Sequence, residues 1–160
     1  MQTTSVKLEV QEGINLILGQ AHFIKTVEDI YETLTDASPT IKFGIAFCES
    51  SGPALIRYDG NEKKLEDIAV QFARKLSAGH VFVVILENAY PINVLNRLKA
   101  VDEVTNIYCA TSNPVEVIVV ETEQGRGVLG VIDGMKSRGV EGDKEKNERR
   151  EFLRRIGYKK

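Results

Sequence analysis

The sequence contains no tryptophan, and only two cysteines and two histidines occur among its 160 residues. Cys48 and Cys109 do not form a C-x-x-C pair, and such scattered cysteines and histidines do not form a zinc-binding pattern. Each cysteine lies in an apolar segment. We therefore expect both to be small, buried thiols, as in proteins of the reducing cytoplasm.

Long hydrophobic runs are also absent. No stretch of 18 apolar residues occurs, and residues 1–7 lack the apolar core of a signal peptide, so we expect no membrane span and no secretion signal. The net charge of −2 gives no reason to expect a nucleic acid as partner. The charge is uneven, because residues 143–160 carry eight basic and four acidic residues. We expect this segment to dock on its own or a neighbouring chain, with anion binding as the alternative.

Hydrophobic periodicity predicts a single α/β domain over residues 1–160, of the α+β kind with a mixed sheet. Seven to eight strands and four helices are expected. The strand candidates are residues 6–10, 15–18, 41–48, 55–58, 80–87, 106–110, 115–120 and 128–132. The helix candidates are residues 26–36, 62–77, 92–101 and 144–156, with Gly79 as the stop of the second.

A weak internal repeat links two parts of the chain. Residues 47–53 and 108–114 share the order aromatic, Cys, any residue, hydroxyl, Ser, Gly or Asn, Pro. Each segment follows a strand–helix–strand pattern and precedes a strand, which indicates a duplicated β-α-β-β unit. Such a duplication would bring four loops together. They are residues 19–26, 49–53, 87–93 and 110–114.

The two histidines lie at junctions between predicted elements. Histidine is a neutral base and nucleophile near pH 7, so both are candidates for chemistry, although a packed structural histidine is the commoner case. Thr26 is expected to cap a helix whose N–H groups favour an anion near His22, with Lys25 adding positive charge. His80 follows a helix C-terminus, which opposes a phosphoryl group. Position alone therefore favours His22 over His80 as the histidine beside a phosphate.

Polar residues in the four loops are candidate ligand contacts. Their hydroxyls, amides and carboxylates suit ribose, base or metal contacts, although turn formation is the more common use of such residues. The candidates are Gln20, Lys25, Glu49, Ser50, Ser51, Tyr90, Asn93, Thr111, Asn113 and Asp133. The run Gly125–Gly130 matches G-x-G-x-x-G, but apolar residues follow it as in a strand, so an ordinary hairpin is favoured over a phosphate loop.

Nearly the whole chain resembles the adenosine-specific kinase family. The resemblance rests on the joint occurrence, in order, of several segments. They are residues 15–29, 42–52, 78–82, 90–94, 110–114, 129–134 and 153–158.

The resemblance implies an α/β subunit that binds adenosine and AMP, assembles into trimers or multiples of trimers, and carries a phosphorylatable histidine. That histidine corresponds to His80, which reverses the positional argument and leaves His22 as a second site residue. Mg²⁺ is a candidate for charge neutralisation, but no set of ligands is evident and no other cofactor is implied. The phosphoryl donor stays open. Two competing interpretations are a binding module that senses adenylate without turnover, and a structural protein without a ligand.

Overall fold

The structure, a computed structural model, describes residues 1–160 and confirms the predicted α+β class with eight strands and four helices. The elements follow one another in a fixed order. They are β1 (Gln2–Leu8), β2 (Asn15–Ala21), α1 (Thr26–Ala37), β3 (Lys42–Cys48), β4 (Ile56–Gly60), α2 (Lys63–Leu76), β5 (Val81–Glu87), α3 (Pro91–Lys99), β6 (Val104–Thr111), β7 (Val115–Glu121), β8 (Arg126–Asp133) and α4 (Asp143–Arg155).

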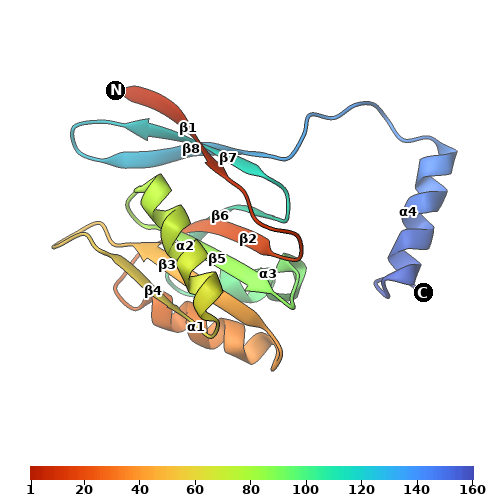
Figure 1. Cartoon of the computed structure of the whole chain (residues 1–160), viewed down its shortest axis with the longest axis horizontal. Helices are drawn as coiled ribbons and strands as arrows, with labels where there is room; N and C mark the ends of the chain where they lie inside the picture. The colour runs from red at the N-terminus through yellow and green to blue at the C-terminus, as the bar shows by residue number, and fades with distance from the viewer.

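The strands form two sheets in which every neighbouring pair is antiparallel. The larger sheet has the order β4-β3-β5-β2-β6, and the smaller has the order β1-β7-β8. Helices α1 and α3 cover one face of the larger sheet, while α2 and the smaller sheet cover the other (Figure 1). The two central strands, β5 and β2, are therefore buried on both faces, which explains their nearly continuous apolar sequences.

Alternation along the central strands builds two separate cores. Leu16, Leu18 and Val83 pack toward α2 and the smaller sheet, whereas Ile17 and Val84 pack toward α1 and α3. These five side chains are fully buried, and each such burial stabilises the fold by about 1.5–3 kcal/mol. A shift of one residue in either central strand would exchange the two sets, so the pattern specifies the register.

The succession strand–helix–strand–strand does occur twice, as β2-α1-β3-β4 and as β5-α3-β6-β7. In the larger sheet, β5 separates β2 from β3, and β2 separates β5 from β6. This interleaving is the split β-α-β arrangement of ferredoxin-like folds. The two units differ at their last strand, because β4 pairs with β3 whereas β7 joins β1 and β8.

The expectation that four loops converge is wrong. It assumed parallel strands, but the central pair of β2 and β5 is antiparallel, so equivalent loops of the two units lie at opposite edges of the sheet. The loops at 19–26 and 49–53 follow β2 and β3 at one edge. The loops at 87–93 and 110–114 follow β5 and β6 at the other.

Two predicted helix boundaries are also corrected. Thr26 is not an N-cap that binds helix N–H groups, because its Oγ1 donates hydrogen bonds back to the carbonyls of His22 (3.0 Å) and Phe23 (2.8 Å). The α2 helix ends with Ser77 in the left-handed conformation (φ 46°) rather than with Gly79. At Thr26 the difference arises because the short hydroxyl side chain bonds to nearby backbone carbonyls instead of to helix N–H groups.

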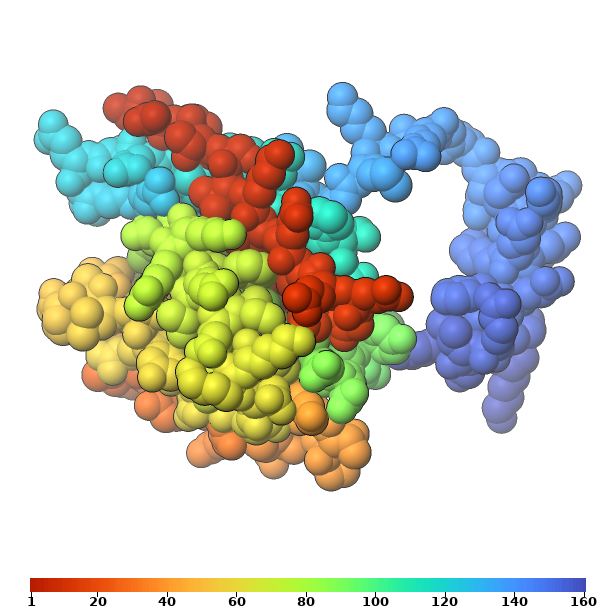
Figure 2. All heavy atoms as spheres, in the orientation of Figure 1, coloured from red at the N-terminus to blue at the C-terminus, as the bar shows by residue number.

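The last helix stands apart from the rest of the chain. Residues 134–142 extend from β8 and carry α4 away from the two sheets (Figures 1 and 2). None of the residues of α4 is buried. Phe152, Ile156 and Tyr158 are each more than two-fifths exposed, so this basic segment does not dock on its own chain.

Candidate functional site

A cleft of about 640 Å³ opens at one edge of the larger sheet. Its walls are the segment that follows β3, the turn between α2 and β5, and the hairpin between β7 and β8. Four of the candidates from the sequence line it, namely Gln20, Glu49, Ser50 and His80. Its remaining lining is predominantly polar or glycine. The cleft is therefore suited to a small polar ligand, and its volume lies within the usual range for small-molecule sites.

His80 is the residue immediately before the central strand β5. Its backbone has a φ of +63°, a left-handed conformation that is uncommon for a residue other than glycine. Two hydrogen bonds hold this conformation, one from His80 N to Cys48 O (2.7 Å) and one from Ala21 N to His80 O (2.9 Å). Such locally unfavourable backbone is concentrated at functional sites in proteins, where the surrounding structure maintains it.

The imidazole of His80 is packed on one side and open on the other. Its ring stacks on Phe47 with 5.7 Å between the ring centroids. Its side chain remains 33% exposed and lines the cleft. The ring therefore has a restricted orientation and is still accessible to a ligand.

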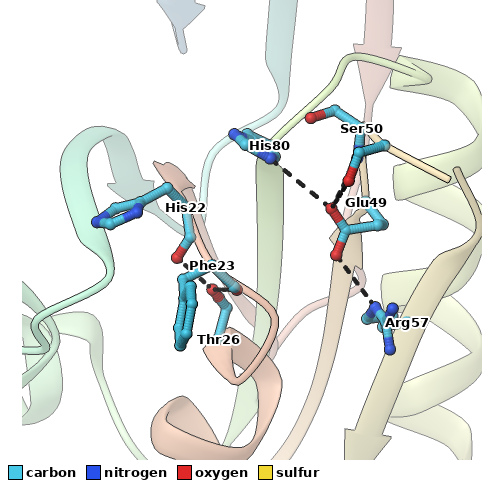
Figure 3. A network of polar contacts seen from close by, with 8 residues as sticks. His22, Phe23, Thr26, Glu49, Ser50, Arg57 and His80 are labelled. Atoms are coloured by element: carbon cyan, nitrogen blue, oxygen red, sulfur yellow. Dashed lines mark hydrogen bonds and ion pairs between the residues drawn. The ribbon is translucent and has the colours of Figure 1, made fainter.

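Glu49 places a carboxylate beside this ring. Its Oε1 lies 3.8 Å from His80 Nε2, and Oε1 also accepts a hydrogen bond from the Ser50 N–H at 3.1 Å (Figure 3). On the other side, its Oε2 accepts a hydrogen bond from Arg57 Nε at 3.2 Å. The Glu49 side chain is only 11% exposed. These contacts hold the carboxylate at a defined position next to the imidazole.

Gly79 allows the two sides of the cleft to approach closely. A Cβ at this position would lie 2.8 Å from the Cβ of Ser50, closer than such atoms come in folded proteins. The close approach of residue 79 to residue 50 brings the turn that carries His80 against the segment that carries Glu49. Glycine is therefore required here by space.

Arg126, at the start of β8, is a cleft residue that the sequence analysis missed. Its Nη1 donates to the carbonyls of Lys75 (3.2 Å) and Leu76 (2.9 Å) at the end of α2, and its Nε pairs with Glu121 Oε2 at 2.9 Å. Arg126 thereby places a positive charge where the helix leaves carbonyls unpaired. The one available indication was its position between two glycines in the expected hairpin, which the structure confirms.

His22 and Lys25 lie near this edge of the sheet but do not line the cleft. The His22 side chain is exposed, and Figure 3 shows its ring pointing away from Glu49. Lys25 Nζ pairs with Asp29 (2.6 Å) and with the buried Glu103 (3.0 Å), and hydrogen bonds to these carboxylates raise its pKa. The charge of Lys25 is therefore matched within the chain, and neither side chain is part of the cleft around His80.

The other polar candidates lie at the opposite edge of the sheet or outside the cleft. Asn113 Nδ2 donates to Asp133 Oδ1 (3.1 Å), Asn113 N donates to Thr111 Oγ1 (3.0 Å), and Tyr90 N donates to Asn93 Oδ1 (2.8 Å).

A second cleft, of about 450 Å³, lies at this edge and includes Tyr90 among its lining residues. Ser51 is near the His80 cleft, with its Oγ 3.5 Å from Glu49 Oε1, but does not line it. The structure therefore separates Tyr90, Asn93, Thr111, Asn113 and Asp133 from His80, and the side chains of the last four take part in local hydrogen bonds of the ordinary kind.

No group of three or more His, Cys, Asp and Glu side chains is arranged so that it could hold a metal ion. None of the helices is both long enough and apolar enough to cross a bilayer. Cys48 and Cys109 are both free thiols. Cys48 is buried and Cys109 half-buried, and burial raises the pKa of each to about 11.

Comparisons with known proteins identify relatives over nearly the whole chain. The crystal structure of the PH1918 protein from Pyrococcus horikoshii OT3 superposes with a TM-score of 0.95 at 49% sequence identity, over 99% of this chain and 98% of that chain. No curated protein matches the sequence. A family model described as adenosine specific kinase matches residues 6–159. The chain therefore belongs to the adenosine-specific kinase family.

Proposed function

We propose that the cleft around His80 binds adenosine or AMP and that His80 exchanges a phosphoryl group with this ligand. The observation that carries the proposal is the His80 ring itself. It is held in a left-handed backbone position, stacked on Phe47, and open to a polar cleft large enough for a nucleoside. The family to which the chain belongs supplies the adenosine specificity of the proposal.

The proposed reaction transfers a phosphoryl group from AMP to His80, and it also runs in reverse. A neutral imidazole nitrogen attacks the phosphorus of AMP, a nitrogen–phosphorus bond forms, and the bond to the ribose oxygen breaks to leave adenosine after protonation. In reverse, the ribose hydroxyl of adenosine attacks the phosphohistidine, the nitrogen–phosphorus bond breaks, and AMP forms as the hydroxyl proton leaves to water. A covalent intermediate divides one transfer into two easier steps.

The residues of the cleft have distinct parts in this proposal. Gln20 and Ser50 offer an amide and a hydroxyl to the ribose or base. The Nε and Nη1 groups of Arg126 are bonded to Glu121 and to the end of α2, so Nη2 is the donor that it offers to the phosphate. Neither His22 nor Lys25 has a part in it, because neither lines the cleft.

A chase of labelled phosphate tests the proposal against its main competitor. We expect protein phosphorylated with ³²P to transfer the label to added adenosine and yield labelled AMP. A protein that only senses adenylate would bind AMP in the same cleft and keep its label. Label that stays on the protein while adenosine is bound would therefore overturn the transfer step and favour the sensor.

We further propose that the chain assembles with copies of itself, as a trimer or a multiple of trimers. The basic helix α4 exposes Phe152 and Ile156, whereas residues 1–142 carry a net charge of −6. Residues 1–142 of a second copy therefore carry the charge opposite to that of α4 and can bury its apolar side chains.

Analytical ultracentrifugation tests this assembly. We expect Phe152→Glu to dissociate the oligomer into monomers that remain folded, because Phe152 is exposed within its own chain. Asn147→Ala serves as the control, because this residue is exposed and uncharged on the same helix, and it should leave the mass unchanged. A wild-type protein that sediments as a monomer contradicts the proposal.

A further inference from the structure

The two nitrogens of the His80 ring have different surroundings. Nε2 faces the carboxylate of Glu49 at 3.8 Å. Nδ1 lies on the side of the ring that is turned away from Glu49 (Figure 3). In a neutral imidazole one nitrogen carries the proton and the other carries the lone pair, and the hydrogen-bond partner of one nitrogen decides which is which.

Glu49 cannot easily leave this position. Arg57 holds one of its oxygens and the Ser50 N–H holds the other, while the side chain is nearly buried. The carboxylate is an acceptor only, so it favours the tautomer in which Nε2 carries the proton. A separation of 3.8 Å is longer than a hydrogen bond, but such contacts in ligand-free sites commonly tighten when the ligand binds.

The same carboxylate disfavours a phosphoryl group on Nε2. The phosphoryl oxygens would occupy the gap of 3.8 Å between Nε2 and Glu49 Oε1 and place like charges in contact. A phosphoryl group on Nδ1 avoids this contact. It also leaves the proton on Nε2, where the positive charge of the phosphorylated ring faces the carboxylate.

We propose that Glu49 is a positioning residue that holds the proton on Nε2 and so makes Nδ1 of His80 the phosphoryl acceptor. This inference rests on the proposed function. In the forward step the Nδ1 lone pair attacks phosphorus, and the bond between phosphorus and the AMP oxygen breaks. In the return step the electron pair of the nitrogen–phosphorus bond goes back to Nδ1, and the adenosine hydroxyl proton leaves to water.

Two measurements test the inference. The first is the tautomer of His80 in the unphosphorylated protein, read from ¹⁵N NMR shifts of histidine labelled in the ring. The second is the position of the phosphoryl group after reaction with AMP or with phosphoramidate, read by NMR or by antibodies specific for each phosphohistidine isomer. Neither readout would change if Glu49 served only to hold the fold together.

In wild type we expect the tautomer with the proton on Nε2 and a phosphoryl group on Nδ1. In Glu49→Ala we expect the ratio of Nδ1 to Nε2 phosphohistidine to fall by about tenfold or more, the bias that a charge-assisted hydrogen bond supports. Glu49→Gln retains an acceptor oxygen and should restore part of the bias. Asp67→Asn removes an exposed carboxylate from α2 and serves as the control.

The outcomes separate this inference from the function on which it rests. Phosphohistidine found on Nε2 in wild type overturns the role of Glu49 and leaves the phosphohistidine itself in place. An unchanged isomer ratio in Glu49→Ala overturns it as well. Failure to form any phosphohistidine, with AMP or with phosphoramidate, overturns the proposed function and with it Nδ1 as acceptor. In that case the tautomer measurement alone reports whether Glu49 orients the ring.

Discussion

The two edges of the larger sheet are built from equivalent parts of the two interleaved units, yet they differ in chemistry. At one edge, the residue immediately before the central strand β5 is His80, which is open to a polar cleft. At the other, the residue immediately before β2 is Ile14, which is buried. The loop after β3 contributes Glu49 toward the histidine ring, whereas the equivalent position in the repeat is Ala110.

The two edges also differ in the contacts that their polar side chains make. At the edge formed by the loops after β5 and β6, which we call the Tyr90 edge, Asn113, Asp133 and Asn93 form hydrogen bonds to neighbouring groups. At the His80 edge, Gln20 and Ser50 line the cleft beside the histidine ring. A polar loop is therefore a weak indication of a binding site until its hydrogen-bond partners are known.

Replacement of His80 should have the largest effect. We expect His80→Ala to abolish protein phosphorylation, because it removes the only imidazole in the cleft. His22→Ala is the matched variant, since its side chain is exposed and lies outside the cleft, and it should keep phosphorylation near the wild-type level. Incorporation of ³²P measures both. Phosphorylation lost in His22→Ala and kept in His80→Ala would show that His22, not His80, accepts the phosphoryl group.

The two cysteines occupy equivalent positions in the two units. Burial raises the pKa of the Cys48 thiol from 9.0 to about 11. The folded protein holds this proton to higher pH than the unfolded chain does, so stability is full below pH 9 and falls as pH rises toward 11. The loss for Cys48 is on the order of 2–3 kcal/mol.

Urea unfolding at pH 8 and at pH 10.5 measures this loss. Cys48→Ala and Cys109→Ala should each reduce the pH dependence by a similar amount, because burial raises the pKa of both thiols to about 11. If stability does not change between the two pH values in wild type, the thiols ionise equally in the folded and unfolded states.

Gly79→Ala tests the close approach of residue 79 to residue 50. The added Cβ meets Ser50, whose short side chain cannot move aside, so the turn before His80 must shift. We expect a stability loss of about 1–3 kcal/mol and a marked loss of phosphorylation. Gly130→Ala is the control, because a Cβ at residue 130 meets no atom within 4 Å. Denaturant unfolding and ³²P incorporation together measure both variants, and equal behaviour would contradict the steric argument.

Asn113→Ala should have the smallest effect. It removes the hydrogen bond to Asp133, which is exposed, so we expect a loss of about 1 kcal/mol or less in stability. Adenosine affinity, measured by calorimetry, should remain unchanged. A clear loss of affinity would show that the Tyr90 edge also contributes to the nucleoside site, as the sequence interpretation expected.

Several features of this protein followed from local patterns alone. The eight strands and four helices, the apolar central strands and the hairpin at Gly125 were all predicted, because periodicity and turn residues act over a few positions. The cap at Thr26 was predicted wrongly, although it too is local. Its hydroxyl can accept a hydrogen bond from a helix N–H or donate one to a nearby carbonyl. In the folded chain the buried Thr26 donates to the carbonyls of His22 and Phe23.

The elements, their order and the two histidines available for chemistry follow from the amino-acid sequence alone. Which loops meet depends on the tertiary contacts. The direction of a strand relative to a distant partner is not encoded in local periodicity, and one antiparallel pair, β2 with β5, sends equivalent loops to opposite edges. That pairing left Tyr90 and Asn113 far from the histidine. Tertiary contacts likewise placed Glu49 beside His80 and brought Arg126 into the cleft.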